Sequence, residues 1–246
     1  MRKNFKLVIR YDGSRYHGWE KKRNLDTIQG KIETVLTRMD GEEVHLIGAG
    51  RTDAGVHARA MTANVHLQTF FSTEKIKKYM NTYLPDDIAI VEVKEVSERF
   101  HARYHAVGKT YRYTFYDGED KPVFDRKYVT VTAESPDIDK MREAASLLEG
   151  RHDFKSFCGN PKMKKSTVRT VDSIRISRQG DRIHMDFHGD GFLQHMVRIL
   201  AGTLLEVGVG RRRPEEMPEI LAACDRKKAG PTAPPGGLCL MEVEYH

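Results

Sequence analysis

One carboxylate stands among small residues in the segment 48–60, which reads GAGRTDAGVHARA. The glycines around Asp53 indicate a loop in which the backbone turns sharply or something approaches closely, because glycine alone adopts positive φ without steric cost. An ordinary loop aspartate that makes an Asx turn or caps a helix gives the same pattern. Asp53 is therefore a candidate for chemistry, with a purely structural role left open.

A second candidate is a cation in the segment FLQHMVRILAGTLLEVG, which predicts a helix from about Leu193 to Glu206. Both sides of this helix carry apolar or small residues, so it is predicted to be largely buried. A guanidinium in such surroundings needs a carboxylate or phosphate partner. Arg198 is therefore predicted to have such a partner, unless its head extends to solvent over apolar surface.

Other kinds of site find little support in the sequence. The segment around His184, Asp186, His188 and Asp190 places four polar side chains on one face of a strand, but no HExxH or Cys/His zinc spacing is present. A polar strand surface explains this pattern better than a metal site does. The sequence also contains no GxSxG, P-loop or GxGxxG motif, so hydrolase, NTPase and dinucleotide-binding functions are not indicated.

Composition indicates a soluble globular protein with an acidic partner. The chain has 246 residues, 39% of them apolar, a net charge of +6 and a pI near 9.1. Basic residues cluster in segments predicted as loops or element ends, and such clusters suit a phosphate backbone as well as a solvated surface. No long apolar run and no secretory signal is present, so we expect no membrane insertion and a cytoplasmic location. The three scattered cysteines predict neither a disulfide nor a zinc framework.

The elements that must position these residues mix strands and helices without regular alternation. Strands are predicted at 5–13, 109–116, 171–177, 182–188 and 238–245, and helices at 26–39, near 138–148 and at 193–206. Gln179-Gly180-Asp181 is predicted to join two strands in a hairpin. This pattern predicts an α+β fold with a mainly antiparallel sheet and flanking helices. We place the seam near Gly118–Ser135, which divides the chain into halves 1–120 and 121–246.

Seven ordered blocks resemble a bacterial TruA-type tRNA pseudouridine synthase. They are YDGSRYHGW, GAGRTDAGVHA, NTYLPDDI, FHARYHAVGKTYRY, LLEGRHDFKSF, GFLQHMVRILAGTLLEVG and KKAGPTAPPGGLCLMEV, and they cover nearly the whole chain. The resemblance implies a pseudouridine synthase fold, with two similar halves that meet at a basic RNA-binding cleft. It also implies a homodimer that isomerises uridine to pseudouridine in the tRNA anticodon stem-loop, at positions 38–40, without metal or cofactor.

Carried over residue by residue, the family's catalytic aspartate falls on Asp53 and its base-stacking tyrosine on Tyr111. The arginine of its HHMVR block falls on Arg198, and we expect that residue to pair with Asp53. The arginine of GRTD is Arg51, which is expected to fill the vacancy left by a flipped base. Without the resemblance, Tyr111 reads as one more side chain on the stripe that it forms with Tyr113 and Phe115.

The reaction needs one ionised carboxylate, because uridine isomerisation is redox-neutral. Asp53 attacks C1′ or removes the C2′ proton, and the sequence does not choose between these roles. The chain departs from the family at Glu20, where Gln is usual, and at Arg59-Ala60-Met61. These departures leave open a divergent paralogue acting on another RNA site. A non-catalytic RNA-binding module is the competing class of function, and a metal-dependent nuclease lacks its ligands.

Overall fold

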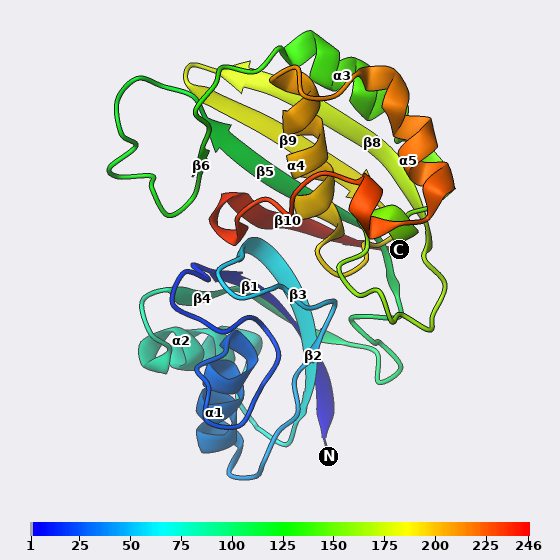
Figure 1. Cartoon of the computed structure of the whole chain (residues 1–246). Helices are drawn as coiled ribbons and strands as arrows, with labels where there is room; N and C mark the ends of the chain where they lie inside the picture. The colour runs from blue at the N-terminus through cyan, green and yellow to red at the C-terminus, as the bar shows by residue number, and fades with distance from the viewer. Residues whose placement is uncertain (1) are drawn as a thin grey trace. The chain divides into compact units, whose positions relative to one another are not determined.

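The computed structural model describes residues 2–246, which form two compact units. One unit comprises Met1–Val107 together with Cys239–His246, and the other comprises Gly108–Leu238. Figure 1 shows helices and strands in both units. Residues 2–246 contain five α-helices and ten strands, and none of these helices has the length and apolar composition needed to cross a membrane. The sequence-based division at residue 120 stays a prediction.

The N-terminal unit is a sheet with two helices beside it. Its strands lie in the order β4-β1-β3-β10, with the short β2 paired to β3. All of these pairs are antiparallel except β10 with β3, which is parallel. The elements are β1 (Lys3–Tyr11), α1 (Ile28–Asp40), β2 (Ile47–Gly48), β3 (His57–Leu67), α2 (Thr73–Tyr83), β4 (Ile88–Val96) and β10 (Leu238–Tyr245).

Helix α1 shows how local sequence makes an element of this unit. Thr27 caps its first turn by accepting a hydrogen bond from the Gly30 N–H, and Gly41 ends it in the left-handed conformation with φ of 82°. The apolar stripe predicted for this segment is buried, with Ile32 and Leu36 wholly inaccessible. The sequence predicts this helix with Asp26 or Thr27 as its cap; the helix is confirmed, and the cap is Thr27.

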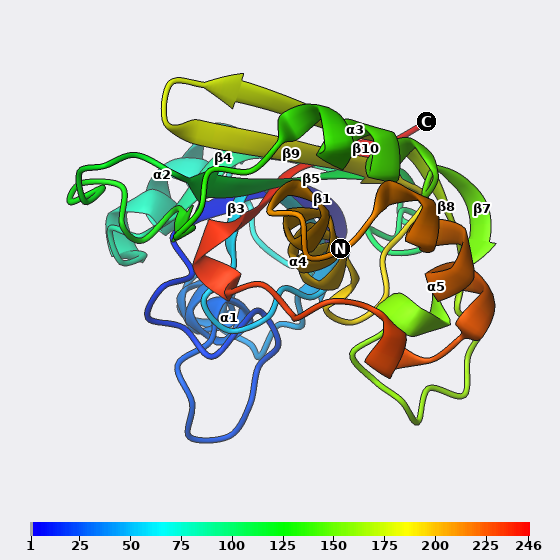
Figure 2. The ribbon, with the colours of Figure 1, turned by 45° about the horizontal axis from the view of Figure 1, so that its top comes forward.

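Within the C-terminal unit the strands lie in the order β5-β9-β8-β7 with antiparallel pairing, and β6 pairs in parallel with β5. In Figure 1, α4 crosses in front of β9, and α3 packs against both α4 and β8. Figure 2 shows the β8–β9 hairpin from a second direction. The elements are β5 (Ala106–Tyr116), β6 (Thr130–Val131), α3 (Ile138–Ser146), β7 (Gly150–Asp153), β8 (Val168–Gln179), β9 (Arg182–Gly189), α4 (Met196–Gly208) and α5 (Met217–Ala223).

The α+β class and the mainly antiparallel pairing predicted from the sequence are both confirmed. The β8–β9 hairpin turns at Gly180, whose φ is 58°, as the predicted turn requires. Helix α4 is largely buried, as predicted, but it begins at Met196 rather than Leu193, because His195 has a left-handed backbone with φ of 60°. The basic cluster Lys75, Lys77 and Lys78, predicted to lie on a loop or at the end of an element, begins in the first turn of α2.

Candidate functional site

Asp53 lies in the loop between β2 and β3 of the N-terminal unit, with its side chain half-buried. The backbone turns at this point, because the Val56 N–H donates to the Asp53 carbonyl over 3.2 Å and Gly55 has φ of 79°. Gly48, just before the loop, is closely approached: a Cβ there would lie 2.7 Å from the indole nitrogen of Trp19. The sharp turn and the close approach predicted for these glycines are both present.

The residue before Asp53 holds this loop in place. Thr52 is buried, and its hydroxyl hydrogen-bonds the phenol of Tyr11 over 2.8 Å. Its carbonyl accepts a hydrogen bond of 3.1 Å from the Trp19 N–H. Two contacts from different segments therefore fix the backbone next to Asp53, while the Asp53 side chain stays partly accessible.

The segment YDGSRYHGW forms hydrogen bonds with the segment NTYLPDDI. The Asp87 carboxylate accepts hydrogen bonds from the guanidinium of Arg15 and, over 2.6 Å, from the hydroxyl of Tyr16. Burial disfavours the charged carboxylate, but these hydrogen bonds outweigh it and lower the pKa of Asp87. The Tyr16 carbonyl accepts from the Gly55 N–H over 3.3 Å. Three blocks far apart in the sequence thus meet around the Asp53 loop.

Arg51 is exposed and forms an ion pair of 2.7 Å with Glu20. Glu20 is one of the positions at which this chain departs from the family pattern, so the departure has a structural consequence. Because both side chains are well exposed, the pair adds little to stability.

Arg198 and Tyr111 belong to the C-terminal unit. The Arg198 side chain is half-buried, and its Nε donates a hydrogen bond of 2.8 Å to the Ala233 carbonyl. The Ala233 N–H donates back to the Arg198 carbonyl over 3.1 Å. The segment KAGPTAPPGG is thereby joined to α4, and a backbone carbonyl is one partner of this guanidinium.

Tyr111 differs in burial from its neighbours on β5. Tyr113 and Phe115 are fully buried, whereas Tyr111 is partly exposed. Its ring meets Phe192 edge to face, with centroids 5.4 Å apart. Tyr113 instead donates its hydroxyl proton to the Pro234 carbonyl over 2.7 Å, and burial raises its pKa. A ring that is only partly covered leaves surface on which a base can stack.

The polar face of β9 is occupied by cross-strand contacts. Asp186 accepts two hydrogen bonds from Arg112, of 2.7 and 2.8 Å, and His184 contacts Thr114 over 3.2 Å. His188 contacts Thr110 over 3.1 Å. Within residues 2–246, no group of three or more His, Cys, Asp or Glu side chains is arranged to hold a metal ion.

Comparison with known proteins identifies the family of this chain. A family model described as tRNA pseudouridine synthase matches residues 7–105 and 144–246. The chain belongs to this family. It is 43% identical to tRNA pseudouridine synthase A 2 of Clostridium perfringens over 243 residues, which cover 99% of this chain and all of the relative. It is 46% identical to tRNA pseudouridine synthase A of Bacillus sp. strain KSM-64, over 98% of this chain and 99% of the relative.

Family membership confirms the resemblance that the ordered blocks indicated. The structure brings Arg51 and Asp53 together on one loop, and it places Tyr111 and Arg198 in the other unit. Sequence reasoning missed the contact of Tyr11 with Thr52 and the pairing of Glu20 with Arg51. The only signal for either was that these residues belong to, or adjoin, the quoted blocks.

Proposed function

We propose that this chain converts uridine to pseudouridine in tRNA, with Asp53 as the catalytic carboxylate. The observation that carries the proposal is the loop itself. Its backbone is held at Thr52 by Tyr11 and Trp19, while the carboxylate one residue later remains half-exposed. A fixed, reachable carboxylate is what attack at a sugar carbon requires. The full-length similarity to tRNA pseudouridine synthases supports the same reaction.

The reaction breaks one bond between the base and the sugar and forms a different one. The N1–C1′ bond breaks, the uracil turns, and C5 bonds to C1′; C5 then loses its proton and N1 gains one, so the product is an isomer of uridine. An ionised Asp53 attacks C1′ and holds the sugar as an ester, or it removes the C2′ proton to leave a glycal. No electrons are gained or lost overall, so the proposed reaction uses no cofactor.

The RNA must present its uridine outside the helical stack, because C1′ and the base are otherwise shielded. We assign Arg51 to the vacancy that the flipped base leaves. We assign Tyr111 to stacking on the extruded uracil, a contact worth about 1–3 kcal/mol. The partial exposure of the Tyr111 ring supports this assignment.

The pairing of Arg198 with Asp53 stays a prediction from the sequence. A guanidinium near Asp53 favours its ionised form and orients it. The double variant Asp53→Asn with Arg198→Ala tests it: stability lost in Arg198→Ala is partly recovered in the double variant if the two side chains are coupled. Additive losses of unfolding free energy contradict the pairing.

For the substrate, we propose uridines 38–40 of the anticodon stem-loop, modified by a cytoplasmic homodimer. The family relationship and the net charge of +6 support an RNA partner. The departures at Glu20 and at Arg59-Ala60-Met61 keep another RNA site as the second candidate, since Glu20 contacts the arginine assigned to the RNA. Mapping pseudouridines in RNA from a strain without this gene decides between the two.

The decisive experiment separates catalysis from binding. Asp53→Asn keeps the size of the side chain and removes its charge, so conversion of uridine falls to background while tRNA affinity stays within a few fold. Asp120→Asn, a change at an exposed loop aspartate, serves as the matched control and keeps full activity. Conversion by Asp53→Asn at the parental rate refutes the assignment. Binding by the unmodified protein without any conversion establishes the non-catalytic RNA-binding function instead.

A further inference from the structure

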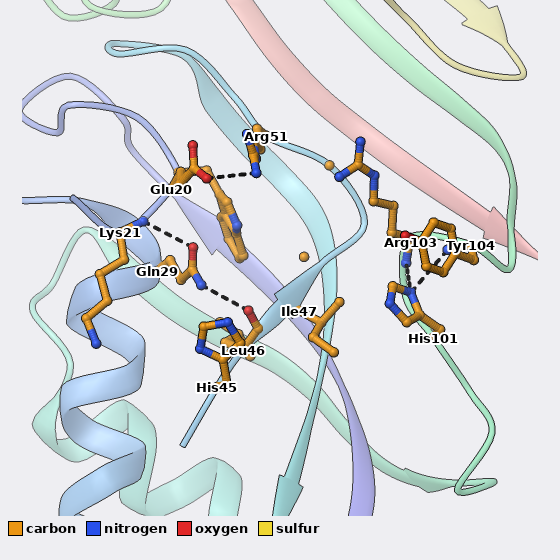
Figure 3. A pocket seen from close by; sticks show the side chains of 13 residues that line it. Glu20, Lys21, Gln29, His45, Leu46, Ile47, Arg51, His101, Arg103 and Tyr104 are labelled. Atoms are coloured by element: carbon orange, nitrogen blue, oxygen red, sulfur yellow. Dashed lines mark hydrogen bonds and ion pairs between the residues drawn. The ribbon is translucent and has the colours of Figure 1, made fainter. Parts of the chain in front are cut away.

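A pocket of about 380 Å³ opens beside the Asp53 loop in the N-terminal unit. Figure 3 shows Arg51 and Glu20 on one side of it, and Arg103 and Tyr104 on the other. Asp53 is not among the residues that line this pocket, whereas Gly50 and Arg51 of the same loop are. We propose that the pocket binds a second, unpaired nucleotide of the RNA, next to the target. This inference rests on the proposed function.

One wall of the pocket is a turn with a fixed backbone. The Ala102 N–H donates to the buried side chain of Asn64 over 2.8 Å, and the Ala102 carbonyl accepts from the Tyr245 hydroxyl over 2.6 Å. The His101 imidazole Nδ1 accepts from the N–H groups of Arg103 and Tyr104, over 3.2 and 3.3 Å. Four hydrogen bonds thus hold one short turn, which makes it a rigid support for the side chains it carries.

Those side chains project from the turn into solvent. Tyr104 is 77% exposed, and its ring stacks on His101 with centroids 4.2 Å apart at an angle of 28°. Unpaired RNA bases are recognised by stacking on aromatic rings presented in this way. A nucleobase that stacks on Tyr104 extends the stack that Tyr104 already forms with His101. The Tyr104 side chain therefore loses little conformational freedom when the base binds.

The opposite wall carries groups suited to a base edge. Trp19 is 2% exposed and is seated over Gly48, which has no side chain to displace it. The pocket lining also includes the Arg51 guanidinium and the Glu20 carboxylate, which lie 2.7 Å apart. A guanidinium only donates hydrogen bonds and an ionised carboxylate only accepts them. A base edge offers both kinds of group, whereas a phosphate offers acceptors alone, so this pair favours a nucleoside over a simple anion.

The pocket also contains a cation for the phosphate of that nucleotide. Lys21 already pairs with the buried Glu33 over 3.0 Å, and Arg51 pairs with Glu20. The exposed Arg103 makes no ion pair within the described residues. Arginine binds phosphate oxygens through two parallel hydrogen bonds. We therefore assign the phosphate to Arg103 and the base to Tyr104.

The chain carries its own reporter for this pocket, because Trp19 is its single tryptophan. An anticodon stem-loop RNA added to the full-length Asp53→Asn variant is expected to change the Trp19 fluorescence in step with binding measured by anisotropy of a labelled RNA. Uridine monophosphate at high concentration is expected to give part of the change, and inorganic phosphate none. Bound RNA that leaves Trp19 unchanged, or phosphate that reproduces the full signal, overturns the proposal.

Substitutions test which side chains bind the nucleotide. Tyr104→Ala is expected to weaken stem-loop binding by about 5- to 150-fold, the equivalent of about 1–3 kcal/mol for one stacked base. Tyr104→Phe keeps the ring and binds as the parent does. Arg103→Ala raises KM for tRNA and reduces the slope of binding against salt by roughly one.

Matched controls lie on the same unit but outside the pocket lining. Tyr83→Ala removes another exposed tyrosine, and Arg99→Ala removes another exposed arginine. If these controls weaken RNA binding as much as the pocket variants do, the pocket has no special role. Absence of pseudouridine in reactions of the parent protein refutes the proposed function alone, since the Trp19 signal still reports whether RNA enters the pocket.

Discussion

Gly18→Ala tests whether the backbone around Thr52 positions Asp53. Gly18 has φ of 95°, and a Cβ at this position would lie 2.8 Å from the Thr52 carbonyl oxygen and 3.3 Å from the Asp53 carbonyl carbon. Both neighbours are backbone atoms, so neither can turn aside as a side chain does. The loop must therefore shift by several tenths of an ångström to admit one methyl group.

Gly41→Ala is the matched control for backbone strain. Gly41 has φ of 82°, and a Cβ there meets nothing within 4 Å. Placing alanine in the left-handed region costs about 1–2 kcal/mol at either position. At Gly18 the shift also stretches the hydrogen bond of 3.1 Å from Trp19 to Thr52. Loss of a buried hydrogen bond adds about 1–3 kcal/mol, which brings the expected cost for Gly18→Ala to roughly 2–5 kcal/mol.

The two variants are compared by urea unfolding and by single-turnover conversion of saturating tRNA. Gly18→Ala is expected to reduce the rate by about 10- to 100-fold, since a misplacement near 1 Å costs about 100-fold in catalysis. Gly41→Ala is expected to lose stability but keep the parental rate. Equal losses of stability and unchanged rates in both variants refute the claim that the contact of Gly18 with Thr52 holds the catalytic loop.

Three further predictions concern other charged groups. Glu33→Ala leaves two buried donors without an acceptor and is expected to lower the unfolding free energy by about 1–3 kcal/mol, whereas Glu33→Gln loses less in the same urea titration. Arg15→Ala raises the lowered pKa of Asp87, whose stabilising effect is fully present above the unfolded value of 3.8 and is lost as pH falls through the lower folded value. The unfolding free energies of parent and variant should therefore differ at neutral pH and converge only at a pH below that folded value. Lys164→Ala and Lys165→Ala should each weaken tRNA binding and lower its salt dependence by roughly one unit of slope, and a flat salt response of the parent would contradict an electrostatic RNA surface.

Much of the fold was determined by short-range pattern in the sequence. The apolar stripe that follows Asp26 and Thr27 predicted α1, and Gly180 predicted the turn between β8 and β9. These features depend on periods of about two and 3.6 residues and on the conformations that single residue types allow. The same holds for the glycine-rich loop at Asp53. Its role in catalysis came instead from the resemblance of ordered blocks, since one carboxylate in a loop is ambiguous.

Only the tertiary structure decided how these pieces are held. Tyr111 and Tyr113 are two residues apart on β5, so the pattern of the strand treats them alike. The Tyr111 ring is nevertheless partly exposed, whereas the Tyr113 ring is buried and its hydroxyl binds the Pro234 carbonyl. Tyr11 reaches Thr52 across 41 positions of sequence, and the Arg198 guanidinium binds a carbonyl 35 residues further on. Such contacts depend on strand register and chain return, which no local period encodes, because side-chain burial is set by whichever distant segment packs on each face.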